Sequence, residues 1–182
     1  MEDKDLIWRV EEPVLVQKTP VFDVYKQRET AVNGISGDYI AVKAPDWVMT
    51  IPVIGDDFLM VKQWRHASKE LSIEFPGGVA DMSEDMMTSA ARELQEETGY
   101  KAGKMTKLGV VSPNPALFMN RFHIFLAEDL VDTGKQELDH DELLRFMRIP
   151  IKEVIRGFGG SEYQHALMGT ALMMYMREKC LK

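Results

Sequence analysis

The sequence predicts a mixed α/β (α+β) fold, an α/β/α sandwich built on a mixed β-sheet, with a β-rich extension at the N-terminus. Short runs of β-branched and aromatic residues recur along the chain, one central segment has helical periodicity, and a long apolar segment near the C-terminus is typical of a buried helix. A sheet covered by helices is the simplest arrangement that buries all of these segments.

The β-rich runs are separated by residues that favour turns. Asn33-Gly34 and Ser36-Gly37-Asp38 have turn chemistry, and Gly55-Asp56-Asp57 predicts a hairpin between two strands. We therefore divide the chain into an N-terminal β-rich segment, residues 1–45, and a main domain, residues 46–182. The predicted β-rich runs are residues 14–17, 21–26, 39–43, 47–54, 58–65, 71–75, 106–111, 121–127 and 143–149.

Two helices are predicted. The first covers residues 83–97, with Ser83 as its N-cap, Glu84 and Asp85 in its first turn and Gly99 as a left-handed stop. Its buried stripe is predicted to be Met87, Ala90 or Ala91, Leu94 and Thr98. The second helix runs from about Ser161 to Lys179, and its methionines at 168, 173, 174 and 176 are predicted to fill the core.

Composition restricts the class of protein. A net charge of −7 argues against nonspecific nucleic-acid binding, which requires Lys and Arg to neutralise phosphates. The charged N-terminal residues lack a signal-peptide core, and no run reaches the roughly 18 apolar residues that cross a bilayer. The single cysteine, Cys180, excludes an internal disulfide. We expect a cytoplasmic protein that contacts neither membrane nor nucleic acid.

Acidic residues are concentrated between Gly78 and Tyr100. Glu84, Glu93, Glu96 and Glu97 surround Arg92 in the order G-x5-E-x7-R-E-hydrophobic-x-E-E-x-G-hydrophobic. Residues three and four apart share a face of a helix, so the last three glutamates lie close together and repel one another. A solvated helix face with an Arg–Glu pair is the simple alternative. Mg²⁺, or Mn²⁺ in its place, would relieve the repulsion, because hard cations prefer oxygen ligands.

The complete pattern resembles the signature of the Nudix hydrolases, and we call residues Gly78–Tyr100 the box. The resemblance implies that water attacks a phosphorus atom of a diphosphate with the help of metal ions. It implies metal binding by Glu93, Glu96 and Glu97, with support from Glu84 and the carbonyl of Gly77. Arg92 would orient the glutamates through charge-assisted hydrogen bonds.

The approach to the box is similar to that of ADP-ribose pyrophosphatases and related nucleotide-sugar hydrolases. Gln63-Trp64-Arg65 and the run from Glu74 to Gly78 occupy the corresponding places. The resemblance implies that Arg65 binds a phosphate and that Glu74 contacts the nucleoside or a metal-bound water. A surface arginine and a structural hydrogen bond are the respective alternatives.

Two loops complete the expected site. Pro115 lies sixteen residues after Gly99, where this branch has a proline, but Ser-Pro-Asn-Pro-Ala replaces the usual Ser-Pro-Gly. Phe118 and Asn120 in the same loop are candidate substrate contacts. A later acidic segment resembles the loop that supplies a catalytic base, and Glu142 matches best, with Glu137 and Asp139 as alternatives.

The resemblance also implies a homodimer built by the N-terminal strands, in which Trp8, Phe22 and Trp47 either contact the partner or pack in the core. The predicted function is hydrolysis of a nucleoside diphosphate linked to another moiety, such as ADP-ribose or an NDP-sugar. A nucleoside triphosphate pyrophosphatase of the same family is the first alternative, and a non-catalytic nucleotide sensor is the second.

Overall fold

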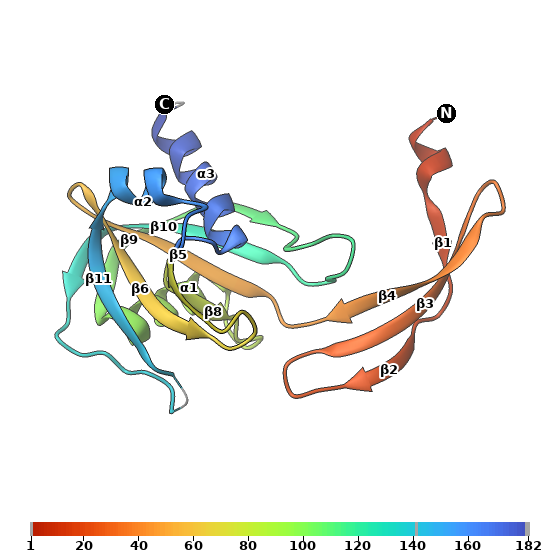
Figure 1. Cartoon of the computed structure of the whole chain (residues 1–182), viewed down its shortest axis with the longest axis horizontal. Coiled ribbons are helices and arrows are strands. Elements are labelled where there is room, and N and C mark those ends of the chain that lie inside the picture. Colours follow the sequence, from red (N-terminus) through yellow and green to blue (C-terminus); the bar gives the residue numbers. More distant parts are fainter. Residues whose placement is uncertain (1, 141, 181–182) are drawn as a thin grey trace. The chain divides into compact units, whose positions relative to one another are not determined.

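The computed structural model describes residues 2–140 and 142–180, and its elements are labelled in Figure 1. It separates into two compact units. The first contains the chain up to Pro45 together with Ser112–Arg121, and the second contains Asp46–Val111 and the chain from Phe122 onward. The elements of the first unit are η1 (Asp3–Leu6), β1 (Trp8–Val10), β2 (Val14–Lys18), β3 (Asp23–Ala31) and β4 (Ser36–Lys43).

The first unit is a four-stranded antiparallel sheet. Strands β1 and β2 pair with successive parts of one edge of β3, and β4 pairs with its other edge. The predicted turn at Asn33-Gly34 joins β3 to β4, with Gly34 in the left-handed region at φ +86°. The loop 112–121 attaches to β4, because the backbone of Val42 exchanges hydrogen bonds with Leu117 and Met119 at 2.8 and 2.9 Å.

The second unit contains a mixed seven-stranded sheet and three helices. Its elements are β5 (Trp47–Ile54), β6 (Asp57–Arg65), β7 (Glu70–Glu74), β8 (Gly77–Val79), α1 (Met86–Thr98), β9 (Tyr100–Val111), β10 (Phe122–Asp132), β11 (Leu144–Pro150), α2 (Ile151–Gly157) and α3 (Ala166–Cys180). The strand order is β11-β6-β5-β10-β9, with β7 paired to β6 and β8 paired to β5. Only the β5–β10 pair is parallel among these strands.

The sheet opens between β5 and β6. The predicted hairpin at Gly55 joins these strands, but they pair only through Val53↔Phe58 and Ile54↔Asp57. Beyond this point β6 pairs with β7 and β5 pairs with β8. The two short strands therefore line an opening in the sheet, and the candidate site lies there.

Alternating side chains on β5 and β10 pack against helices on opposite faces of the sheet. Val48 and Phe125 pack with Ala90 of α1. Met49 and Ile124 belong to the larger core cluster, which also contains Met168 and other side chains of α3. Figure 1 shows α2 and α3 on one side of this sheet and α1 on the other. This arrangement confirms the predicted sandwich of mixed α/β class.

Several predicted helix details are wrong. The N-cap of α1 is Asp85, whose carboxylate accepts hydrogen bonds from the N–H groups of Met87 and Thr88, whereas Ser83 donates its N–H and hydroxyl to Asp81. Met87 is exposed. Gly99, at φ +74°, ends the helix as predicted.

The C-terminal region also differs from the prediction. Residues 151–157 form the short helix α2, which the sequence did not indicate, and α3 begins at Ala166 rather than near Ser161. Met168 is fully buried in the core, but Met173 and Met176 are exposed, since α3 packs its buried residues against one face of the sheet. Strands β9 and β10 form a longer hairpin than predicted, which includes residues 128–132 of the expected acidic loop.

Within residues 2–140 and 142–180, no helix combines the length and apolar character needed to span a membrane.

Candidate active site

The box occupies β8, the loop after it, and α1. Arg92 is its central cation, and its guanidinium contacts three carboxylates. The nitrogen–oxygen distances are 2.6 Å to Glu96, 3.1 Å to Glu93 and 3.4 Å to Glu84. Glu84 precedes the helix and also accepts a hydrogen bond from the Ser89 hydroxyl at 3.0 Å. Arg92 thus contacts three of the glutamates that it is predicted to orient, and the orienting role itself stays a prediction.

Glu97 lies on the buried side of α1. Its side chain accepts a hydrogen bond from the N–H of Gly77 at 2.9 Å, which ties the helix to β8. Burial raises the pKa of Glu97 well above its ordinary value; the Gly77 hydrogen bond opposes this change, and the charges of Glu93 and Glu142 add to it.

The side chain of Glu93 packs closely against Gly78 of β8. A Cβ atom on Gly78 would lie 2.8 Å from its Oε2, so only glycine leaves room for the carboxylate in this position. The pKa of Glu93 is raised to about 7, mainly by burial and also by the charges of Glu96 and Glu142, while Arg92 opposes this change. In this chain, a side chain at position 78 would therefore require the Glu93 carboxylate to move.

The box offers oxygen ligands only, which suits a hard divalent cation. The carboxylates crowd around a single guanidinium, so added positive charge would be stabilised there. In the described part of the chain, however, no three acidic, His or Cys side chains converge as a ready metal-binding cluster. Glu93 and Glu96 instead contact Arg92, and Glu97 accepts from Gly77. The metal-ligand roles of Gly77, Glu84, Glu93, Glu96 and Glu97 therefore stay a prediction.

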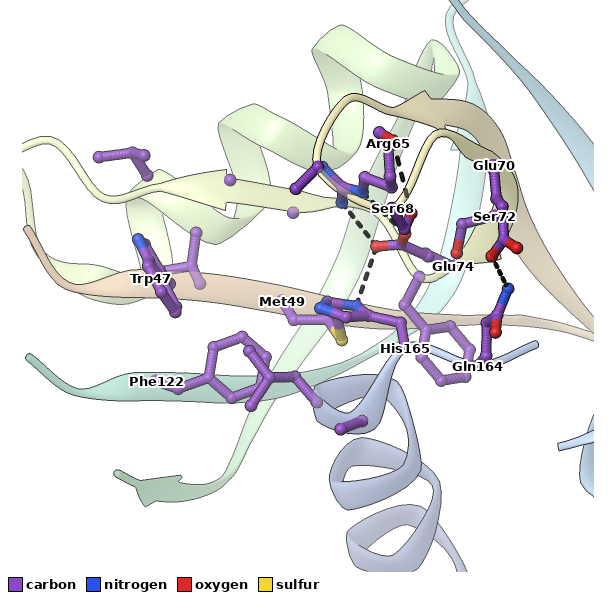
Figure 2. Close-up of a pocket in the computed structure, with 18 residues that line it drawn as sticks. Trp47, Met49, Arg65, Ser68, Glu70, Ser72, Glu74, Phe122, Gln164 and His165 are labelled. Carbon is purple, nitrogen blue, oxygen red and sulfur yellow. Dashed lines mark hydrogen bonds and ion pairs between the residues drawn. The ribbon is translucent and has the colours of Figure 1, made fainter. Parts of the chain in front are cut away.

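A cavity of about 570 Å³ lies in the opening between β5 and β6. Figure 2 shows Trp47, Met49 and Phe122 along one side of it and the polar side chains of β6 and β7 opposite. Gly77 and Gly78 also line the cavity, and the same two residues touch Glu97 and Glu93 of the box. The cavity and the box therefore share the strand β8.

Arg65 and Glu74 form an ion pair in the wall of this cavity. The Nε and Nη2 atoms of Arg65 donate to the two oxygens of Glu74 at 2.8 and 2.6 Å. Glu74 is only 1% exposed. Burial raises its pKa, but Arg65 and His165 outweigh burial and hold the pKa well below its ordinary value. Both predicted residues therefore lie at the cavity, where Arg65 is already paired with a carboxylate.

The acidic loop approaches the box from the C-terminal end of α1. The N–H of Glu137 donates to the carbonyl of Glu96 at 2.9 Å, while the Glu137 side chain is exposed and pairs with Lys135. The Glu142 carboxylate accepts from the N–H of Asp139 at 3.2 Å. Its charge raises the pKa of both Glu93 and Glu97, whereas Asp139 is exposed. Electrostatics therefore associates Glu142 with the box.

Pro115, Phe118 and Asn120 belong to the first unit. Pro115 is exposed and Phe118 is half-buried. Asn120 is buried, and its amide donates to the carbonyl of Pro45 at 2.9 Å, so it fixes the loop to the end of the first unit's chain. The structure thus gives Asn120 a structural hydrogen bond, and the substrate contacts expected from these three residues stay a prediction.

Sequence reasoning missed several cavity residues, among them Phe122, Gln164, His165 and Glu70. Alternation along β7 could have revealed Glu70, since residues 70, 72 and 74 share one face of the strand. Gln164 and His165 come from a segment without a recognisable pattern. Trp47, which we considered for the dimer surface, lines the cavity.

The fold and the site can now be compared with known proteins. The NUDIX domain model matches residues 45–166. The ADP-ribose pyrophosphatase of Bacillus subtilis (strain 168) is 31% identical over 164 residues, which cover 89% of each protein. The ADP compounds hydrolase NudE of Escherichia coli (strain K12) is 27% identical over 127 residues, 70% of this chain and 68% of that protein.

A third relative is the methanol dehydrogenase activator of Bacillus methanolicus, 29% identical over 129 residues and 68% of each protein. A crystal structure of an ADP compounds hydrolase superposes with a TM-score of 0.84, covering 94% of this chain and 95% of that one at 23% identity, which supports the fold. The match to the domain model spans more than half of the chain, and the predicted resemblance is confirmed. The chain belongs to the NUDIX family of hydrolases, which generally use divalent metal ions.

Proposed function

We propose that this protein is a pyrophosphohydrolase that cleaves the diphosphate bond of a nucleoside diphosphate linked to another moiety, with ADP-ribose as the first substrate to test. The observation that carries the proposal is the shared strand β8. Gly77 and Gly78 contact the glutamates of the box and also line the 570 Å³ cavity. A diphosphate at the box would therefore place one of its organic groups in the cavity, whose volume is typical of small-molecule sites.

The residues of the box have distinct roles in this proposal. Glu93, Glu96 and Glu97 would hold Mg²⁺, or Mn²⁺ in its place, with Glu84 and the Gly77 carbonyl in support. The cation would supply positive charge against the oxygens of the diphosphate. Arg92 keeps the glutamates in place through its contacts with Glu84, Glu93 and Glu96.

A proton acceptor is also required, because water must lose a proton as it attacks phosphorus. Glu142 is our choice over Glu137 and Asp139. Its charge acts on Glu93 and Glu97, whereas the side chain of Glu137 is exposed and paired with Lys135. Arg65 contributes a guanidinium at the wall of the cavity, with Glu74 as its fixed partner.

Relatives support the substrate class. The B. subtilis relative is named an ADP-ribose pyrophosphatase and the E. coli relative an ADP compounds hydrolase. The test is a panel of nucleoside diphosphate derivatives and nucleoside triphosphates with Mg²⁺ or Mn²⁺, with products identified by chromatography. We expect AMP and ribose 5-phosphate from ADP-ribose, and no turnover in excess EDTA. Preferential cleavage of triphosphates, with ADP-ribose left intact, would refute the proposed substrate class.

We further propose that the first unit forms a homodimer interface in a cytoplasmic protein. All five residues of β2 are exposed, including Val14, Leu15 and Val16, and exposed apolar patches of this kind mark interaction surfaces. The single cysteine fits a reducing compartment. Light scattering coupled to gel filtration should give twice the mass of 20.8 kDa. Val14→Asp with Val16→Asp should shift this mass toward the monomer.

A further inference from the structure

The segment Glu162–His165, which we call the strap, precedes α3 and runs beside β7. The N–H of Ile73 donates to the carbonyl of Glu162 at 2.8 Å, which adds a backbone hydrogen bond to the edge of β7. The Glu162 carboxylate pairs with Lys62 on β6. The strap is therefore fixed to both strands of this half of the sheet.

Two side chains of the strap enter the cavity wall (Figure 2). The amide of Gln164 donates to Glu70 Oε2 at 2.6 Å, and His165 Nδ1 lies 2.9 Å from Glu74 Oε2. Glu70, Ser72 and Glu74 alternate along β7 and all line the cavity. The strap thus contacts the first and the last of the three polar side chains on this face of the strand.

His165 contacts the Glu74 carboxylate in addition to Arg65. Glu74 Oε2 accepts a hydrogen bond from Arg65 Nη2 at 2.6 Å and lies 2.9 Å from His165 Nδ1, while Oε1 accepts from Arg65 Nε at 2.8 Å. With contacts from both sides, the carboxylate cannot rotate without losing one of them. Arg65, half of whose side chain is exposed, is in turn held by Glu74. The strap therefore contacts Glu74 through His165, and Glu74 in turn contacts Arg65.

The chemistry of this wall favours one kind of ligand group. Carboxylates are acceptors, so Glu70 and Glu74 attract hydroxyl and amino donors, and they repel a phosphate. The opposite side carries Trp47 and Phe122, which suit a flat or apolar face. A sugar or nucleoside fits this combination, whereas the diphosphate fits the box.

We propose that His165 is a positioning residue for substrate binding, which holds the Glu74–Arg65 pair so that this wall binds the hydroxyl-bearing part of the substrate. The inference rests on the proposed function for the identity of the substrate. His165 contacts the substrate only through Glu74, so its loss should weaken binding more than it slows chemistry.

The test compares His165→Ala and His165→Asn with the wild type, using ADP-ribose and Mg²⁺. His165→Ala removes a contact to a charged group, and we expect KM to rise about tenfold with kcat within about twofold. Asparagine keeps an N–H donor near the place of Nδ1, and we expect it to restore KM to within about threefold. The control is Lys179→Gln. Lys179 lies at the far end of α3, where it pairs with Glu128, and its substitution should leave both kcat and KM unchanged.

Equilibrium binding of ADP-ribose in EDTA, followed by calorimetry, separates this inference from the proposed function. A tenfold weaker Kd for His165→Ala supports the role of His165 even where the wild type binds without hydrolysing. An unchanged Kd and KM for His165→Ala would overturn the inference. Equal losses of ADP-ribose affinity in His165→Ala and His165→Asn, together with lower thermal stability in both, would also overturn it. Failure of the wild type to bind ADP-ribose overturns both proposals.

Discussion

Glu74→Gln is the change that tests the buried ion pair most directly. The substitution keeps the size of the side chain and removes its charge. Glu74 is 1% exposed and receives two hydrogen bonds from Arg65 and a contact from His165, so its charge is held entirely by protein groups. Gln can still accept from Arg65, but without the attraction between full charges.

The expected loss in the free energy of unfolding depends on how deeply Glu74 and Arg65 are buried. Removing one member of a fully buried pair costs about 3–5 kcal/mol. Arg65 is 44% exposed at its side chain and stays hydrated after the substitution, so we expect a smaller loss. A free energy of unfolding reduced by about 2 kcal/mol corresponds to a fall in Tm of roughly 4–8 °C for a chain of this size.

The sign of the pH dependence provides a second test. The folded state holds the pKa of Glu74 well below 4.5, its ordinary value. The group therefore stabilises the fold at pH values above 4.5, and this stabilisation is lost as the pH falls below 4.5 toward the folded pKa. The difference between wild type and Glu74→Gln should be constant near neutral pH and shrink in acid.

Thermal unfolding monitored by circular dichroism measures both effects. Glu128→Gln is the matched control, since Glu128 also has two cationic partners, Lys104 at 2.9 Å and Lys179 at 2.7 Å, but is more exposed. Exposed pairs contribute about 0–1 kcal/mol, so this control should lose little. Equal losses in the two variants, or a Tm of Glu74→Gln within about 1 °C of the wild type, would refute the reasoning.

Three further predictions concern the box. Glu96→Gln and Glu97→Gln should each lower kcat at least about 100-fold with saturating Mg²⁺ while circular dichroism stays unchanged; near wild-type turnover in either would exclude its metal role. Gly78→Ala should displace Glu93, whose Oε2 would lie 2.8 Å from the new Cβ, and lower kcat at least about tenfold. Gly37→Ala, whose Cβ would lie 3.2 Å from the Tyr39 hydroxyl, is its control and should retain full activity. Asp85→Ala should reduce the free energy of unfolding by about 1 kcal/mol through loss of the N-cap, and Ser83→Ala should have little effect. Chemical denaturation measures both, and a larger loss in Ser83→Ala than in Asp85→Ala would contradict the cap assignment.

The strands and the box were predictable because they depend on local sequence. Alternating β-branched residues and the Gly55 turn gave β5 and β6, and the spacing of Glu93, Glu96 and Glu97 gave one helical face. The N-cap was not predictable by the same means. Ser83 and Asp85 are both good caps, but it is the Asp85 carboxylate that accepts from the first N–H groups of the helix, while Ser83 donates to Asp81.

The cavity wall was less predictable because it joins segments that are far apart in sequence. Arg65 and Glu74 are nine residues apart, and the pattern before the box pointed to both. His165 reaches Glu74 across a separation of ninety-one residues, and Gln164 reaches Glu70 across ninety-four. The pairing of β6 with β7, the backbone contact of Glu162 to Ile73 and the Glu162–Lys62 ion pair bring the strap to this wall.

Under the proposed function, the balance of charge along β8 would determine the orientation of the bound substrate. At the Arg65 end, Glu74 and Arg65 neutralise each other in a bidentate pair. At the box end, one guanidinium, Arg92, contacts three carboxylates, and Glu97 adds a fourth acidic side chain beside Gly77. We therefore expect divalent cations and the diphosphate to be stabilised at the box, and the uncharged group of the substrate to be stabilised beside Glu74. Since Gly77 and Gly78 connect the two ends, the proposed function would place the bond to be cleaved over β8, with the hydroxyl-bearing part of the substrate toward the strap.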